Sequence, residues 1–188
     1  MGRIVATEYV SVDGVIEAPS GPSDFARAGW TDAYTRGPDG DAYMHAQGME
    51  AGALLMGRLT YEPFAAAWPL FDGEFADRMN AMPKYVVSST LTDPQWNNTT
   101  VVGGDPVAAG ARLRGEVEGD IVVYGSGQVV QALLEADLVD ELRLLVYPVV
   151  VGAGARLFGS TSDLRRLRLA ETRTFDDGVA LLVYQRAA

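Results

Sequence analysis

The chain has 188 residues, of which 48% are hydrophobic and 21% are charged, and its formal net charge is -10. This length and balance predict one globular domain, residues 1–188, that buries a core of its own. The acidic charge argues against nucleic acid as a partner, because phosphate backbones are bound by basic surfaces. Cysteine is absent and His45 is the single histidine. Disulfides and zinc–thiolate sites are therefore excluded, and we expect no metal ligand set.

The N-terminal residues contain no basic segment followed by a long apolar run, and no stretch of the sequence is apolar enough to cross a bilayer. We therefore expect no membrane partner and a cytoplasmic location.

A first strand is predicted over residues 4–10, where β-forming residues alternate loosely, and a turn follows at residues 13–14. Residues 18–40 then hold repeated glycines and prolines together with Trp30 and Tyr34. A loop of this length is uncommon in a compact domain unless it serves a site. Two interpretations stay open: a mobile cover over a pocket, or a surface excursion without a role.

A helix is predicted over residues 41–52, with Asp41 as its N-cap and Gly52 at its end. A buried strand over residues 53–56 follows and stops at Gly57. The next helix is expected to begin at Thr60, whose hydroxyl suits a helix start.

The rest of the chain alternates between the two kinds of element. Helices are predicted over residues 60–68, 75–82, 106–114 (capped by Asp105) and 128–136. Strands are predicted over residues 84–89, 99–102, 120–124 and 141–151, and a hairpin over 167–175 and 179–185. Such alternation predicts an α/β protein with a mostly parallel sheet and helices on both faces, and the closing antiparallel hairpin makes the sheet mixed.

Three of the predicted strands end in groups that suit an anion. They are Gly57 with Arg58 and Thr60, then the hydroxyls of Ser88, Ser89 and Thr90, then Gly125, Ser126 and Gly127. Ligands of parallel sheets bind beyond the carboxyl ends of the strands, and a helix N-terminus there favours phosphate. The alternative interpretation is that each is an ordinary strand-to-helix turn with a solvated arginine. Val130 stands where the third glycine of a Gly-x-Gly-x-x-Gly fingerprint would be, which disfavours the classical dinucleotide fold.

The sequence resembles the dihydrofolate reductase-like superfamily, and within it the branch of the reductase domain of bacterial riboflavin biosynthesis. The resemblance spans nearly the whole chain. It is carried by the segments at residues 11–16, 56–62, 85–89, 123–127, 148–154 and 157–158. It implies a three-layer fold and an NADPH-dependent reductase that acts on a small heterocyclic (pterin-, pyrimidine- or flavin-precursor-like) or carbonyl substrate.

The resemblance also implies roles for particular residues. Gly57, Arg58 and Thr60 would hold cofactor phosphate, and Ser88 and Ser89 would approach the 2′-phosphate with Arg58 as its cation. The pyrophosphate would lie over the turn formed by Gly125, Ser126, Gly127 and Gln128.

Candidates for a catalytic acid are fewer. In folate-reducing members a carboxylate on the first helix lies near the pterin, and Asp41 has a comparable place here. The N-cap interpretation of Asp41 is the favoured one. Asp13 lies in a motif shared with the riboflavin-type reductases, but it also suits a turn.

Three hypotheses follow for the whole chain. The first is an NADPH-dependent oxidoreductase, and the second is a non-catalytic protein of the same fold that binds a nucleotide or metabolite. The third is a purely structural role in which the apolar strand over residues 142–151 forms a dimer edge. A homodimer is expected under each.

Overall fold

The structure is a computed structural model that describes residues 1–21, 23–159 and 164–187. One sheet of eight strands runs through it in the order β4-β3-β2-β5-β1-β6-β8-β7. The strands are β1 (Arg3–Ser11), β2 (Ala51–Gly57), β3 (Lys84–Val87), β4 (Thr99–Val101), β5 (Asp120–Tyr124), β6 (Glu141–Tyr147), β7 (Leu167–Thr174) and β8 (Ala180–Arg186). The first six strands in chain order are mutually parallel, whereas β8 and β7 form the antiparallel hairpin.

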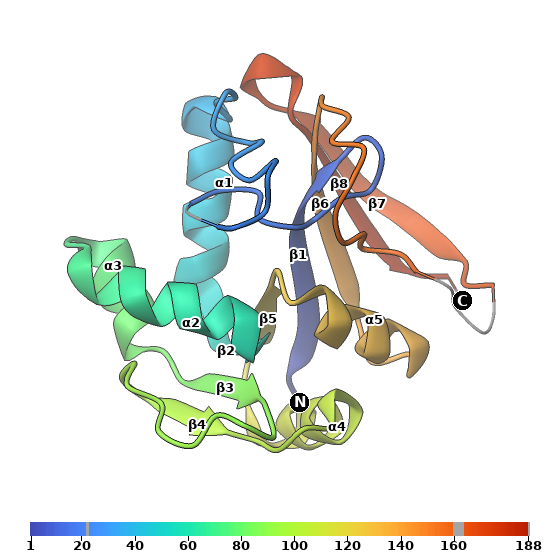
Figure 1. Ribbon diagram of the computed structural model, residues 1–188. Coiled ribbons are helices and arrows are strands. Elements are labelled where there is room, and N and C mark those ends of the chain that lie inside the picture. The colour runs from blue at the N-terminus through green and yellow to red at the C-terminus, as the bar shows by residue number, and fades with distance from the viewer. Residues whose placement is uncertain (22, 160–163, 188) are drawn as a thin grey trace.

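Five α-helices of the described chain flank the sheet (Figure 1). They are α1 (Gly37–Glu50), α2 (Arg58–Ala67), α3 (Glu74–Ala81), α4 (Pro106–Glu116) and α5 (Gly127–Glu135). The helices α1, α2 and α3 pack on one face of the sheet, and α4 and α5 pack on the other. The three layers confirm the predicted architecture.

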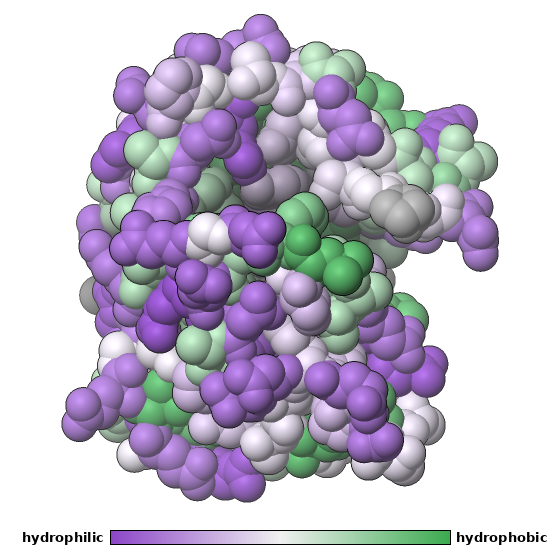
Figure 2. All heavy atoms as spheres, turned by 90° about the vertical axis from the view of Figure 1, so that its left-hand side faces the viewer, coloured by the Kyte–Doolittle hydropathy of each residue, from purple (hydrophilic) through white to green (hydrophobic). Residues whose placement is uncertain are grey.

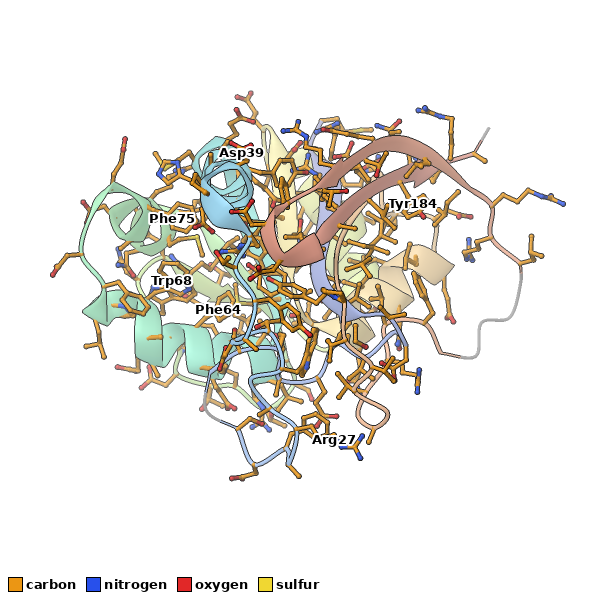
Figure 3. All side chains as sticks on the ribbon, turned by 90° about the horizontal axis from the view of Figure 1, so that it is seen from above. Arg27, Asp39, Phe64, Trp68, Phe75 and Tyr184 are labelled. Atoms are coloured by element: carbon orange, nitrogen blue, oxygen red, sulfur yellow. The ribbon has the colours of Figure 1, made fainter. Side chains whose placement is uncertain are left out.

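Strand alternation divides the core between these two faces. On the α4–α5 face, Ile4 and Ala6 of β1 pack with Leu142 of β6 and Leu133 of α5. On the opposite face, Phe64, Trp68 and Phe75 from successive helical segments stack edge to face (Figure 3), with ring centroids 6.3 and 5.5 Å apart. Burial of these apolar surfaces is the dominant favourable term in folding.

The outer side of the α1–α3 layer is mostly hydrophilic, with a small apolar patch (Figure 2). None of the described helices is both long enough and apolar enough to span a bilayer.

Several predicted boundaries were wrong. Helix α1 begins at Gly37, because Pro38 occupies its first turn, so Asp41 lies inside the helix and is not its N-cap. Gly52 belongs to β2 rather than to the end of the helix before it. Helix α2 is capped by Gly57, so Thr60 lies in its first turn instead of at its start.

The third hypothesis, in which the strand over residues 142–151 forms a dimer edge, is contradicted by the pairing of β6. β6 ends at Tyr147 and is paired on both sides, in parallel with β1 and in antiparallel with β8. Among the described strands, β7 is the long strand with a free edge.

The segment between β1 and α1 is built of turns and is tied to the rest of the chain. Trp30 is buried and donates its indole N–H to the carbonyl of Glu17 at 2.8 Å. Its ring meets Tyr147 of β6 edge to face, with centroids 5.8 Å apart. This segment therefore packs onto the carboxyl end of β6, which argues against a free surface excursion.

Candidate functional site

The parallel register brings the three polar strand ends together. Gly57 lies opposite Val87 at the ends of β2 and β3, so Arg58 and Ser88 follow side by side. On its other edge β2 pairs with β5, whose end leads into Gly125. The anion-suited groups thus line one edge of the sheet along three adjacent strands.

Two helix N-termini meet there, because β2 leads into α2 on one face and β5 leads into α5 on the other. The Ser126 hydroxyl joins them, since it accepts from the amide of Gly57 at 3.0 Å and donates to the Thr60 hydroxyl at 2.9 Å. Ser126 is held in the left-handed region at φ 61°. A non-glycine residue in that region is strained, and such strain clusters at functional sites.

The first amides of α5 are suited to bind an anion. Within the described chain, neither Gly127 nor Gln128 gives its backbone N–H to an acceptor. Unpaired amides at a helix N-terminus, together with the helix dipole, form an anion site.

Glycines keep side chains out of this turn. A Cβ on Gly125, whose φ is 55°, would stand 3.4 Å from the Thr60 hydroxyl, and one on Gly57 would stand 3.5 Å from Val129. The tip of the Ile16 side chain lies directly against Gly127. A ligand over Gly127 therefore requires Ile16 to turn aside, which the flexible end of an aliphatic side chain does easily.

Arg58 projects outward from the start of α2. Its side chain is 46% exposed, and its described ionic contact is Glu62, one turn along the helix, at 3.7 Å. Such an exposed pair contributes little to stability. The guanidinium is therefore available to a phosphate at low cost.

The two serines after β3 differ. The Ser88 hydroxyl already accepts from the amides of Thr90 and Leu91, at 3.1 and 3.0 Å. Ser89 lies against Gly104, because a Cβ added to Gly104 would stand 3.5 Å from the Cβ of Ser89. Ser88 therefore shapes the turn, and Ser89 has the freer hydroxyl.

β1 and β5 separate before either loop begins. Their ladder ends at Thr7 and Tyr124, while the pairing of β1 with β6 continues to Ser11. Residues 8–11 of β1 consequently have no strand partner on the β5 side within the described chain. We call this place the strand split. Because β1 and β5 send their chains to opposite faces, it is the kind of topological switch point at which α/β sheets bind ligands.

Glu8, at the strand split, was not singled out from the sequence. It is 2% exposed, and its Oε1 atom is buried without a hydrogen-bond partner in the described chain. Burial raises the pKa of the Glu8 carboxyl well above its usual range. The available signal was one acid within the otherwise uncharged run at residues 4–10.

Asp41 lies on the α1 side of this region. It is 65% exposed and pairs with Arg36 at 2.8 Å, and Arg36 also donates to the Tyr9 hydroxyl. Burial raises the pKa of Tyr9, and it raises the pKa of the neighbouring Tyr147 to about 12. Asp41 therefore belongs to an ion pair at the rim of an aromatic cluster.

Asp13 has a structural use. Its carboxylate accepts from the Ser11 hydroxyl at 2.7 Å and from the amides of Val151 and Gly152 at 2.9 and 2.8 Å. The Ser11 hydroxyl first, and then these amides, lower the pKa of Asp13 to about 2. The carboxylate thus ties the turn after β1 to the loop after β6.

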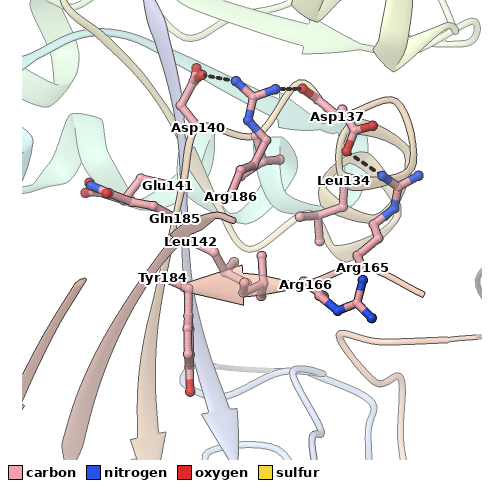
Figure 4. Close-up of a pocket in the computed structure, with 12 residues that line it drawn as sticks. Leu134, Asp137, Asp140, Glu141, Leu142, Arg165, Arg166, Tyr184, Gln185 and Arg186 are labelled. Atoms are coloured by element: carbon pink, nitrogen blue, oxygen red, sulfur yellow. Dashed lines mark hydrogen bonds and ion pairs between the residues drawn. The ribbon is translucent and has the colours of Figure 1, made fainter. Parts of the chain in front are cut away.

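Two hollows lie away from the strand ends. A groove of about 310 Å³ runs between α1 and the strands β6, β8 and β7, with Gln47 and Arg143 in its lining. A cavity of about 30 Å³ lies near the start of β6, where Arg186 pairs with Asp140 at 3.2 Å (Figure 4). The smaller one is too small for a cofactor.

The fold and its strand-end site define a class. The dihydrofolate reductase from Enterococcus faecalis, solved with NADP(H), matches with a TM-score of 0.64 and 15% identity over 100% of this chain and 98% of its own. A putative riboflavin biosynthesis protein from Shewanella sp. PV-4 matches with a TM-score of 0.78 and 23% identity over 99% of both chains. The chain has the dihydrofolate reductase-like fold, which is a reductase-type fold.

Within that class the family is also defined. Residues 3–181 match the RibD C-terminal domain, and the chain belongs to that family. Protein YyaP of Bacillus subtilis strain 168, itself uncharacterized, is 26% identical over 97% of this chain and 94% of its own.

Proposed function

We propose that the protein is an NADPH-dependent reductase of a small heterocyclic substrate (pterin-, pyrimidine- or flavin-precursor-like) or a carbonyl substrate. The observation that carries this proposal is the meeting of two helix N-termini, α2 and α5, on opposite faces of β5. The start of α5 offers unpaired amides, and the start of α2 offers the exposed Arg58. The strand split lies beside both. The phosphates of a dinucleotide need such donors. Its nicotinamide ring needs a place at a topological switch point, which the strand split provides.

The residues present fit NADP(H). The amides of Gly127 and Gln128 would bind the pyrophosphate over the turn that Gly125 leaves clear. Arg58 would bind the 2′-phosphate, with Ser89 as a second donor, because a dianion calls for a permanent cation. Ser126 and Thr60 would hold the two helix starts at a fixed spacing through their hydroxyl–hydroxyl bond.

The cofactor would supply a hydride, and the protein would align it with the substrate. Tyr9 and the Arg36–Asp41 pair lie at the carboxyl end of β1, on the α1 face. They would line the substrate side of the strand split and orient the ring that receives the hydride. Asp41 would act there through Arg36 rather than as a free acid.

The first test is binding of NADPH against NADH, followed by nicotinamide fluorescence. Arg58→Ala should weaken NADPH binding about tenfold, which corresponds to about 1.4 kcal/mol, and leave NADH binding nearly unchanged. Added salt should narrow the difference between the wild type and the variant, because exposed charges are screened.

Arg112→Ala is the matched control, because Arg112 also pairs with a glutamate one turn along its helix at 3.7 Å and is 52% exposed. Arg112→Ala should change neither the affinity for NADPH nor the affinity for NADH. Equal weakening of NADPH and NADH by Arg58→Ala would remove Arg58 from the 2′-phosphate role. Failure of the wild type to bind either nucleotide would overturn the proposal.

A second candidate is a non-catalytic binding protein of the same fold. It is favoured by the engagement of both sequence-predicted acids, because Asp13 is bound to backbone amides and Asp41 to Arg36. It predicts nucleotide binding without NADPH oxidation across a panel of pterins, pyrimidines and aldehydes. Turnover with any of them would decide for the reductase.

A further inference from the structure

Glu8 occupies a distinctive place in the sheet. It lies opposite Leu144 in the β1–β6 register, and Ile4, Ala6 and Val10 of the same strand face α4 and α5. Because side chains alternate along a strand, Glu8 projects to that same face. An acid therefore replaces an apolar residue in the middle of a hydrophobic layer.

The surroundings of Glu8 on this face carry no charge. The side chains that β5, β6, α5 and the turn after β1 contribute to the layer are Ile121, Val123, Leu142, Leu144, Val146, Val129, Val130, Leu133 and Ile16. The ionisable side chains that the described residues add to this layer are two tyrosines. Tyr85 belongs to β3, and Tyr184 belongs to β8, beyond β6 and opposite Leu142. An ionised carboxylate in such a layer is costly, and this burial raises the pKa of Glu8 well above its usual range.

Glu8 is also the first residue of the strand split. The carbonyl of Thr7, just before it, accepts from the amide of Gly125 at 3.4 Å, which is the last contact before β5 turns into α5. Glu8 is thus adjacent in the chain to the residue that contacts Gly125, where the turn to the proposed pyrophosphate site begins. A buried polar atom without a partner calls for an explanation, and a ligand group at the split supplies one.

We propose that Glu8 is the proton-linked residue of this site: neutral when reduced nicotinamide lies at the strand split, and ionised when the oxidised, cationic ring lies there. This inference rests on the proposed function. A cation close to a buried acid favours its carboxylate, whereas a neutral ring leaves it protonated.

The proton balance is simple. On binding of the oxidised cofactor Glu8 loses one proton to the solvent, no covalent bond to carbon changes, and the carboxylate pairs with the ring. On exchange for the reduced cofactor Glu8 takes one proton back. The discrimination between the two redox states of the cofactor then depends on pH through a single group.

The test is isothermal titration calorimetry of NADP⁺ and NADPH in buffers of different ionisation enthalpy at pH 7. For the wild type we expect release of close to one proton per NADP⁺ bound and none per NADPH bound. The affinity for NADP⁺ should rise with pH, by up to tenfold per pH unit, over the range in which Glu8 is protonated in the free protein, because the NADP⁺ complex holds one proton fewer. The affinity for NADPH should follow only the ionisation of the 2′-phosphate, which has a pKa of about 6 and affects both cofactors alike.

Glu8→Gln should release no proton with NADP⁺, and its affinities for NADP⁺ and NADPH should depend on pH in the same way. Glu118→Gln, which changes an exposed acid outside the site, should still release a proton when NADP⁺ binds. Proton release that persists in Glu8→Gln would overturn the inference. If that variant does not fold, the wild type still decides, since NADP⁺ binding without proton release overturns it. Absence of binding by either nucleotide would overturn the proposed function itself, and this inference with it.

Discussion

Lys84 is the single lysine of the chain, and it is buried at the start of β3. Its ammonium group donates to the carbonyls of Asn80, Met82 and Asn97 at 2.9, 2.7 and 2.9 Å. It also lies 4.3 Å from the ring centroid of Trp96. The Lys84 ammonium group therefore joins the end of α3 to the segment before β4. It does so at the start of β3, the strand that leads to Ser88 and Ser89.

Replacement of Lys84 should be costly. Lys84→Met removes an ammonium donor from three carbonyls, of which that of Met82 is in the buried core, and we expect it to lower the free energy of unfolding by about 2–4 kcal/mol in urea titrations. Burial lowers the pKa of Lys84 to about 8, below its unfolded value near 10.4. The unfolded state then binds more protons between those values, so the stability of the wild type relative to Lys84→Met should rise from about pH 8 to about pH 10.

Amine labelling gives an independent check on Lys84. An amine-reactive ester should modify the α-amino group of the native protein and reach Lys84 only on unfolding. Rapid labelling of Lys84 in the folded state would contradict its place in the core. The sequence showed a lysine at the head of an apolar strand but not its burial, because the three carbonyls come from separate segments.

At the scale of elements, boundaries set by local chemistry were predictable. Asp105 before Pro106 predicts a helix start, and the Asp105 carboxylate does accept from the amides of Val107 and Ala108. The start of α1 was not predictable in the same way. It depends on Gly37 at φ 64° beneath Asp176 of the β7–β8 turn, a contact between residues far apart in the sequence.

Asp13 links two elements, because its carboxylate joins the turn after β1 to the loop after β6. Asp13→Asn keeps the size of the side chain but weakens its acceptors, so it should lower the urea midpoint at pH 7. The folded pKa of about 2 lies below the unfolded value near 3.9. The stabilisation is therefore complete above about pH 4 and is lost as the pH falls toward 2, where the wild type and the variant should converge.

The same variant separates structure from chemistry. If Asp13 only positions loops, Asp13→Asn should bind NADPH within about twofold of the wild type, while Asp41→Asn at the exposed ion pair should leave the urea midpoint unchanged. A large loss of NADPH affinity with an unchanged urea midpoint would instead show that Asp13 acts directly in the cofactor site.

At the scale of the molecule, the sequence predicted the fold class and the three polar strand ends, because both follow from local patterns. It did not predict that β5 inserts between β2 and β1, since strand order depends on pairings across the whole chain. The strand split and the place of Glu8 depend on that order. The expected homodimer stays a prediction, and its candidate edge moves from β6 to β7.

The central claim is that one dinucleotide spans the ends of β3, β2, β5 and β1. The most direct measurement is a crystal structure of the protein with NADPH. We expect the 2′-phosphate at Arg58, the pyrophosphate over Gly125–Gly127 with Ile16 turned aside, and the nicotinamide at the strand split beside Glu8. Binding of NADPH elsewhere, for example in the groove between α1 and the β7–β8 hairpin, with Ile16 still against Gly127, would contradict the account.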